Sequence, residues 1–443
     1  MKSAFNIVAT VKRARRSTLV HNIVSLYGMQ IAAYAFPLVT IPYLARVLGA
    51  YSWGLVAIAQ ATGTYVGLVI EFGFNLSATR DVSQSRDDVG RLSEILAGVL
   101  GAKLVLTSVL AVGVFAIQPW FPSFRDNRLL LWSGFAMGAA QAFSMAWLYQ
   151  GLERMRTSAS IEVGSRALGI IGIFLLVHSQ AHAWRVLAIQ AAAMFLGTSI
   201  LIVMAYREIP FRFPSLRESR NSLREGSSMF LLRSAVSLYT TVDVLILGYF
   251  APPVLVGYYS GAERLTRAPL GLLGPIGQST YPRLAHLVSH SQARAAKLAR
   301  ITFVCMGLLA LLAGVVQFFA APLEVRVLLG PEFSPAIPVL RVMGVLLPAV
   351  ALNNVLGIQW MLPLRMDKEC NIVLIGAAVL NVGLACLLAP RFNALGVAIA
   401  VVIAECSITI VLYLFLSARK LNPLHMTDSH QSSARQAEQC AAS

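Results

Sequence analysis

Apolar runs long enough to cross a lipid bilayer recur from one end of this 443-residue chain to the other. A helix needs about 20 apolar residues to span the hydrocarbon core, and a window of that length predicts twelve spans. Their centres lie near residues 32, 62, 106, 138, 169, 195, 239, 268, 309, 346, 380 and 405. Only 13% of the residues are charged, and most connections between spans are short. The sequence therefore predicts an all-α integral membrane protein with no room for a soluble catalytic domain.

The net charge of +16 is distributed unevenly along this predicted topology. If the amino terminus lies in the cytoplasm, most of the 36 Lys and Arg residues fall on the cytoplasmic side, which is the positive-inside pattern. Membrane orientation and contact with anionic membrane lipids then explain the basic character. Nucleic-acid binding is not needed, and we expect both termini in the cytoplasm.

A weak internal repeat divides the spans into two sets. Aligning Trp53–Leu55 with Val256–Tyr258 gives an offset of 203 residues, close to the offset of 210 between Ala188 and Ala398. Each half would hold six spans and insert with the same orientation, as in parallel repeats that enclose a substrate cavity near the midplane. We therefore predict two six-helix lobes related by a parallel pseudo-two-fold repeat. The predicted segments are a basic cytoplasmic amino terminus (1–18), the first lobe (19–206), a basic cytoplasmic linker (207–227), the second lobe (228–417) and a disordered cytoplasmic tail (418–443).

Five basic residues lie inside predicted spans, where charge is costly and usually marks a pathway or a binding site. They are Lys103, Arg166, Arg233, Arg264 and Arg267. At 1.5 Å per helical residue, Arg264 and Arg267 lie about 12 and 17 Å below the predicted periplasmic surface, and Lys103 about 14 Å from the cytoplasmic one. This depth favours contact with an anionic substrate. Arg166 and Arg233 are shallow enough for their side chains to reach the cytoplasmic headgroups instead.

The eighth predicted span carries the densest set of charges. Glu263 and Arg267 are four residues apart and share one helix face, whereas Arg264 points about 100° away and is left for a substrate. The alternative is a purely structural pair of Glu263 and Arg267. Pro269 and Pro275 follow among several glycines, and this pattern predicts a broken helix that lines a cavity.

Acidic residues inside the spans are fewer. Asp243 and Glu405 lie near mid-depth, where a buried carboxylate can couple transport to a proton or to sodium. Either could instead form a structural ion pair or a neutral hydrogen bond. Arg80, with Asp81 and Glu71 nearby, predicts a cytoplasmic gate or a pair that stabilises a loop.

Five motifs together resemble those of Wzx-type polysaccharide flippases. They are Pro42–Gly49, Trp53–Leu55, Glu71–Arg80, Trp147–Glu153 and Gly257–Leu265. The resemblance covers almost the whole membrane region and implies the two-lobed fold of the multidrug/oligosaccharidyl-lipid/polysaccharide exporter superfamily. It also implies that undecaprenyl-diphosphate-linked oligosaccharide, an O-antigen or exopolysaccharide repeat unit, is moved from the cytoplasmic to the periplasmic leaflet of a bacterial inner membrane. A polysaccharide polymerase and a chain-length regulator would then be partners.

Two other function classes remain open. A cation-coupled multidrug exporter of the same superfamily would favour an acidic cavity, whereas the excess of charge inside the predicted spans is basic. A membrane glycosyl polymerase or ligase would carry a sizeable periplasmic loop with catalytic residues, and no connection is long enough. No nucleotide-binding loop and no metal-ligand spacing is present, so we expect neither a cofactor nor a metal.

Overall fold

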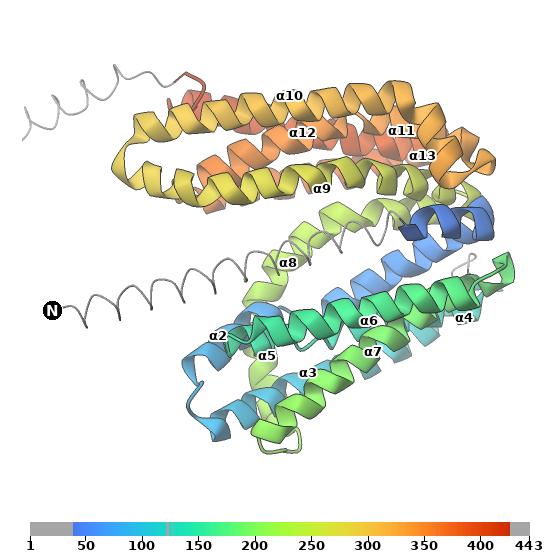
Figure 1. Ribbon diagram of the computed structural model, residues 1–443, viewed down its shortest axis with the longest axis vertical. Helices are drawn as coiled ribbons and strands as arrows, with labels where there is room; N and C mark the ends of the chain where they lie inside the picture. Colours follow the sequence, from blue (N-terminus) through green and yellow to red (C-terminus); the bar gives the residue numbers. More distant parts are fainter. Residues whose placement is uncertain (1–38, 121–123, 126, 426–443) are drawn as a thin grey trace, which may run out of the picture. The chain divides into compact units, whose positions relative to one another are not determined.

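The computed structural model describes residues 39–120, 124–125 and 127–425, and every regular element in these ranges is helical (Figure 1). A helical segment, residues 39–71, precedes α2. The α-helices that follow are α2 (Phe74–Gln84), α3 (Val89–Ile117), α4 (Arg128–Ala142), α5 (Ala146–Gly151), α6 (Met155–Leu176), α7 (Ala183–Glu208), α8 (Leu216–Phe250), α9 (Pro253–His290), α10 (Gln292–Glu324), α11 (Ile337–Met343), α12 (Leu346–Asn353) and α13 (Asp367–Ala418). Shorter 3₁₀ or π turns are η1 (Gln118–Trp120), η3 (Gln180–His182), η4 (Val325–Leu329), η5 (Pro331–Ala336) and η6 (Asn354–Met361).

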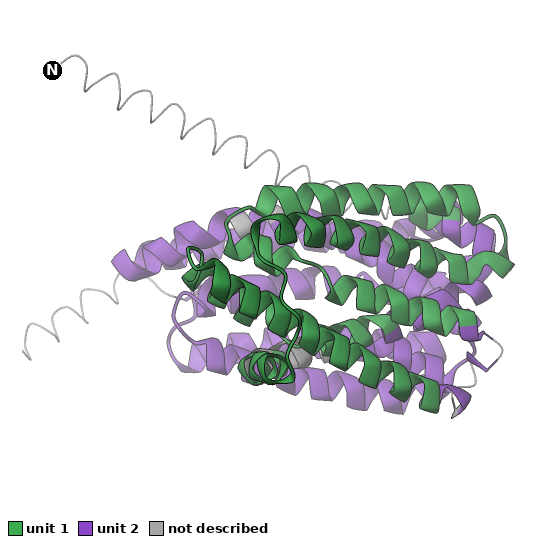
Figure 2. Ribbon diagram, turned by 90° about the horizontal axis from the view of Figure 1, so that it is seen from below, with its two compact units in different colours: residues 1–43, 63–117, 129–230 green, residues 44–62, 118–128, 231–443 purple. Residues whose placement is uncertain are grey.

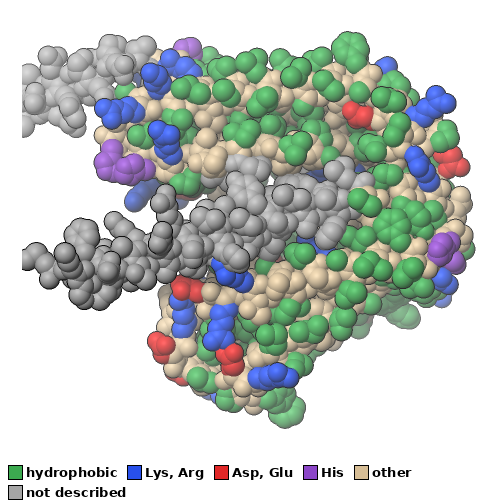
Figure 3. Space-filling view, in the orientation of Figure 1, with side chains coloured by type: hydrophobic (Ala, Val, Ile, Leu, Met, Phe, Trp, Pro, Cys, Tyr) green, Lys and Arg blue, Asp and Glu red, His purple; other side chains and the backbone are tan. Residues whose placement is uncertain are grey.

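Seven helices of the described chain are long and apolar enough to cross a membrane, or eight if the bent pair Pro331–Met343 and Leu346–Met361 is one span. Hydrophobic side chains cover the length of the helices and charged ones gather toward their ends (Figure 3). The chain is therefore an all-helical membrane protein. Eleven predicted centres fall in helices, and the centre near residue 32 lies outside the described residues.

Two of the counted spans contain a break in the backbone. The helical run Val39–Gln84 includes Gly49 at φ 65°, and the run Asp367–Ala418 includes Asn393 at φ 51° and ψ −133°. Positive φ is incompatible with a continuing right-handed helix. Each run thus joins separate helical pieces. The count of seven or eight falls below twelve because Asp367–Ala418 holds two predicted centres, α8 and α9 are not among the counted spans, and the centre near residue 32 lies outside the described residues. Twelve spans remain a prediction.

The described residues cluster into two compact units (Figure 2). Unit 1 holds residues 1–43, 63–117 and 129–230, and unit 2 holds residues 44–62, 118–128 and 231–443. Residues 44–62 and 118–128 belong to the predicted first lobe, yet they cluster with the second half of the chain. The lobe boundaries themselves stay a prediction.

Glycines set the closest helix contacts in both units. In unit 1, a Cβ atom on Gly63 would lie 2.1 Å from the carbonyl oxygen of Gly134, and one on Gly138 would lie 1.9 Å from that of Gly63. In unit 2, a Cβ atom on Gly257 would lie 2.1 Å from the carbonyl oxygen of Ala50. Small residues allow this approach, since dispersion rather than hydrophobic exclusion holds helices together in lipid. Gly54, which the repeat aligns with Gly257, packs against that same turn.

The prediction that the eighth span is broken is wrong. Helix α9 runs without interruption from Pro253 to His290 (Figure 1). Besides Gly49 and Asn393, breaks in the described chain lie between α4 and α5 and at the bend of 40° between the helical stretches that end at Met343 and begin at Leu346. Proline removes one backbone donor and can be accommodated by a bend of the helix, so its presence alone does not fix a break.

The tail predicted from residue 418 is packed for its first part. Trp360 donates its indole N–H to the carbonyl oxygen of Leu421 at 2.9 Å, and Asn422 is buried and donates to the Ser417 hydroxyl at 2.7 Å. Arg300 donates to the carbonyl oxygen of Pro423 at 3.2 Å. Residues 418–425 thus belong to unit 2, which corrects the predicted boundary. Residues 426–443 lie outside the described residues.

Candidate functional site

The central part of α9 and the helical segment 44–62 form a cluster of polar contacts in unit 2. Trp53 is buried and donates its indole N–H to the Ser260 hydroxyl at 3.1 Å. The guanidinium of Arg264 lies over the Trp53 ring, 4.6 Å from its centroid, and donates to Oε1 of Gln60. A cation on the face of a desolvated tryptophan is held by the ring quadrupole. Arg264 is therefore engaged within the protein and is not the free group that helix geometry suggested.

Of the two cations predicted to lie deep in α9, Arg267 is the exposed one. Its Nη2 and Nε lie 2.6 and 3.0 Å from Oε1 of Glu263, so the predicted pair of residues four apart is present. The side chain of Arg267 is 58% exposed, against 23% for Glu263. Arg267 lies 14 residues from Pro253, about 21 Å along a helix of about 57 Å. It thus lies well inside α9 and keeps more than half of its side chain exposed.

Asp243 lies beside these charges. It is 6% exposed and accepts a hydrogen bond of 2.9 Å from the amide group of Asn381 in α13. It also interacts electrostatically with Glu263 and Arg267. The amide oxygen of Asn381 is buried and has no hydrogen-bond partner among the described residues. One carboxylate and one unsatisfied amide oxygen therefore lie close together inside unit 2.

Glu405 forms a different group. Its Oε2 accepts a hydrogen bond of 2.6 Å from the Asn353 amide, and the Asn353 oxygen accepts one from the Thr409 hydroxyl. The Asn353 amide is a neutral partner. The structural alternative for Glu405, a hydrogen-bonded acid without an ion pair in these contacts, thus has geometric support.

Lys103 is fully enclosed in unit 1. Its side chain is 1% exposed, and its Nζ donates to the carbonyl oxygen of Ala142 at 2.7 Å and lies 5.8 Å from the Trp147 ring centroid. Ala142 is the last residue of α4, where carbonyls lack intrahelical donors. Lys103 therefore satisfies a helix end at the break between α4 and α5.

The remaining predicted residues are dispersed. Arg166 is exposed on α6, and the side chain of Arg233 in α8 lies outside the described parts. Arg80 is 55% exposed and pairs with the adjacent Asp81 at 3.2 Å, both within α2, so a role as a gate or in a loop stays a prediction. Glu71 instead accepts a hydrogen bond of 3.0 Å from the backbone N–H of Asn75, and so satisfies a donor in the first turn of α2.

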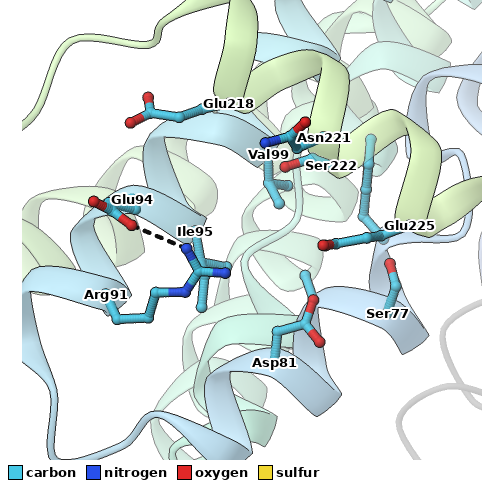
Figure 4. A pocket seen from close by; sticks show the side chains of 12 residues that line it. Ser77, Asp81, Arg91, Glu94, Ile95, Val99, Glu218, Asn221, Ser222 and Glu225 are labelled. Atoms are coloured by element: carbon cyan, nitrogen blue, oxygen red, sulfur yellow. Dashed lines mark hydrogen bonds and ion pairs between the residues drawn. The ribbon is translucent and has the colours of Figure 1, made fainter.

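A small acidic pocket in unit 1 was not anticipated from the sequence (Figure 4). Asp81, Glu94, Glu218 and Glu225 line a cavity of about 70 Å³, together with Arg91, which pairs with Glu94 at 2.9 Å. Burial and the neighbouring carboxylate of Asp81 raise the pKa of Glu225, and the nearby guanidinium groups only partly oppose this.

Sequence patterns could have revealed part of what was missed. The run Ser215–Glu218 is a capping box: Glu218 N–H donates to the Ser215 hydroxyl at 3.1 Å and Ser215 N–H donates to Glu218 at 3.3 Å. It fixes the start of α8 at Leu216. No spacing rule, however, brings Gln60 to Arg264 or Asn381 to Asp243, since these pairs are 204 and 138 residues apart.

The sequence profile of polysaccharide biosynthesis proteins matches residues 19–288. The chain is also 30% identical over 406 residues to a protein of Escherichia coli (strain K12) named "Putative O-antigen transporter", covering 91% of this chain and 98% of that one. The chain belongs to the polysaccharide biosynthesis protein family. The relatives that match are named as transporters or flippases, and this family member is a multi-pass membrane transporter.

Solved structures show the same fold. The lipid II flippase MurJ in an inward closed conformation matches with a TM-score of 0.71 at 14% identity, over 90% of this chain and 87% of that one. An inward-facing multidrug resistance MATE transporter matches with a TM-score of 0.63 at 18% identity, over 89% of this chain and 96% of that one. At these identities the likeness concerns the fold alone.

Proposed function

We propose that this family member translocates undecaprenyl-diphosphate-linked oligosaccharide repeat units from the cytoplasmic to the periplasmic leaflet of a bacterial inner membrane. It would do so by alternating access between two six-helix lobes with both termini in the cytoplasm. Membership in a family of O-antigen transporters supports the glycan as cargo. The observation that carries the proposal for this chain is the exposed guanidinium of Arg267 well inside α9.

The chemistry of a lipid diphosphate fits that group. The diphosphate must exchange its hydration for fixed donors when it enters the membrane, and a planar guanidinium binds phosphate oxygens through two parallel hydrogen bonds. Glu263 holds Arg267 from one side and thereby orients it. In this proposal Arg267 contacts the diphosphate, Arg264 shapes the surface beside it, and Arg166 and Arg233 are further candidates along the path.

Asp243 is the better of the two candidates for ion coupling. Its carboxylate and the unsatisfied oxygen of Asn381 are hard oxygen donors of the kind that sodium accepts, and the same carboxylate could carry a proton. Protonation or ion binding there would change the charge next to Glu263 and Arg267, which interact electrostatically with Asp243. A proton or an ion bound at Asp243 would thus alter the affinity of Arg267 for an anion. Glu405, bound to the neutral amide of Asn353, would have a structural role.

A comparison of two conservative variants tests the role of Arg267. Arg267→Gln should reduce transport about ten- to a hundred-fold, since one charge-assisted contact is worth about 1.5–3 kcal/mol. Glu263→Gln breaks the same ion pair but keeps the guanidinium, and it should retain most transport. Transport is read from the fraction of lipid-linked repeat units that become accessible on the periplasmic side of cells depleted of the native copy. Equal losses in both variants would show that the pair is only structural.

The cargo itself is tested by the depletion. Without the chain, and with no redundant flippase, lipid-linked repeat units should remain on the cytoplasmic side. Normal polymerisation under these conditions would refute the proposal. The drug-exporter alternative is favoured by the carboxylates of Asp243 and Glu263 beside the arginines. It predicts resistance to cationic drugs on overproduction, with no accumulation of lipid-linked glycan on depletion.

A further inference from the structure

The first turns of α8 carry three arginines on one face. Arg217, Arg220 and Arg224, which we call the arginine stripe, are spaced by three and four residues and are all exposed. They line an open surface hollow together with Leu216, Asn221 and Leu223. Within the part of the chain that the structure describes, no hydrogen bond or ion pair engages their guanidinium groups. The stripe therefore presents three unneutralised positive charges to whatever fills the hollow.

Large apolar side chains lie directly before the stripe. Phe211, Phe213 and Leu216 are 59, 81 and 83% exposed. The Phe211 ring contacts those of Tyr206 and Phe213 edge-on, with centroids 5.1 and 5.0 Å apart. Phenylalanine and leucine beside arginine on one short segment are typical of elements that lie in a membrane interface, with the apolar groups in the acyl region and the cations on the headgroups.

The other face of the same turns is fixed to unit 1. A Cβ atom on Gly98 would lie 2.8 Å from the Ser222 hydroxyl, and one on Gly101 would lie 2.4 Å from that of Ser219. These contacts press α8 against α3, and the capping box begins the helix at a defined residue. The stripe is thus a surface of set geometry rather than a flexible basic segment.

Charge pairing distinguishes the stripe from a neighbouring arginine. Arg212 bridges Glu94 and Glu218 at 3.0 and 2.8 Å, so its charge is neutralised within the protein. The carboxylates of this region face the pocket between α8, α2 and α3 (Figure 4). The basic and acidic side chains are therefore sorted to different faces of the same helical turns.

We propose that the arginine stripe, with Phe211, Phe213 and Leu216, is a docking site for the headgroups of anionic phospholipids at the membrane surface. The stripe supplies charge complementarity to the phosphates, and the three apolar side chains supply the attachment to acyl chains that a water-soluble partner would not offer. The site anchors the connection between α7 and α8 to the bilayer. It does not depend on which cargo crosses, so it stands or falls separately from the proposed function.

The test uses the full chain in neutral detergent micelles titrated with phosphatidylglycerol or with phosphatidylcholine. Hydrogen exchange of the amides of residues 211–224 reports binding at the site. Phosphatidylglycerol should protect them at lower concentration than phosphatidylcholine. At low ionic strength each arginine should contribute about five-fold in affinity, so changing all three to Gln should weaken phosphatidylglycerol binding on the order of a hundred-fold. Changing all three to Lys should restore most of it.

A matched variant controls for net charge. Arg283, Arg294 and Lys297 are exposed on α9 and α10, and changing these three to Gln removes the same charge. This triple should change protection of residues 211–224 by less than about two-fold, because it leaves the arginine stripe and the apolar side chains beside it intact. Equal weakening by both triples, equal protection by the two phospholipids, or tighter binding of undecaprenyl diphosphate than of phosphatidylglycerol would each overturn the proposal. If the triple variant of the stripe fails to fold, Arg220→Gln alone is tested. It should weaken phosphatidylglycerol binding about five-fold, and unchanged binding would overturn the proposal.

Discussion

Replacing Lys103 separates a structural role from contact with substrate. The cation donates to the carbonyl oxygen of Ala142 at the end of α4, and its stem is enclosed with 1% of the side chain exposed. Lys103→Ala removes a charged hydrogen bond, worth about 1.5–3 kcal/mol, and leaves a cavity where the four-carbon stem lay. Large-to-small changes of this kind cost about 2–5 kcal/mol. We expect Lys103→Ala to lower the free energy of unfolding by about 3–5 kcal/mol and to reduce the amount of folded protein.

Lys103→Met keeps most of the stem and removes only the charge. Replacing a buried charge by an apolar group of similar volume is often close to neutral, although the carbonyl of Ala142 loses its donor. The expected loss is therefore about 1–2 kcal/mol. Because the charge does not face an open cavity in this structure, the methionine variant should transport nearly as well as the parent per folded molecule.

Unfolding in mixed micelles and transport per folded molecule are measured on the same preparations. A fully stable Lys103→Met variant that does not transport would refute this reasoning, because a charge needed only for packing cannot be essential once packing is retained. Such a result would return Lys103 to the substrate path, as its depth in the predicted third span suggested.

Three further experiments test packing and titration. Gly257→Ala should lower the free energy of unfolding by about 1–3 kcal/mol, because the new Cβ atom would overlap the carbonyl oxygen of Ala50. Gly376→Ala is the control and should have no such effect, since open space surrounds that position. Equal effects of the two variants in thermal unfolding would contradict the close contact. Ending the chain after residue 417 should destabilise unit 2 by about 1–3 kcal/mol, since Trp360 loses its acceptor on Leu421, while ending it after residue 425 should leave the unfolding temperature unchanged. The raised pKa of Glu225 means that the folded state holds its proton to higher pH than the unfolded state, so stability falls as pH rises through that window. Glu225→Gln should therefore stabilise the protein at neutral pH and have little effect in acid, and a gain that is the same at both would contradict this origin of the shift.

The sequence alone was sufficient to locate most spans and one pair of charges on a shared helix face. Hydropathy placed eleven span centres in helices of the described chain, and the spacing of Glu263 and Arg267 predicted their pair. The offset of 203 residues aligned Gly54 with Gly257, and the two lie in contact. In each case the informative quantity is periodicity or rise per residue, which a single sequence contains.

Rotation about the axis and partners distant in the chain could not be obtained in this way. Depth arithmetic placed Arg264 deep in the membrane, but did not show that Trp53 and Gln60 enclose it. It made Lys103 an equally good candidate for substrate contact, although the ammonium group of Lys103 donates to a carbonyl oxygen at a helix end. The break predicted in α9 failed for a related reason, because whether a proline-containing helix breaks or bends depends on the packing around it.

Exposure therefore orders the buried basic residues differently from depth. A cation inside a membrane must be stabilised by protein groups. Lys103 donates to the carbonyl oxygen of Ala142, and Arg264 contacts the ring of Trp53 and the amide of Gln60. Arg267 pairs with the carboxylate of Glu263. The first two arrangements enclose the cation, whereas the third leaves 58% of the side chain exposed. A stabilised cation that is still exposed can be approached by an incoming anion. If the proposed cargo is correct, sensitivity of transport to loss of charge should follow accessibility and be greatest at Arg267, even though Lys103 is equally deep and more completely buried.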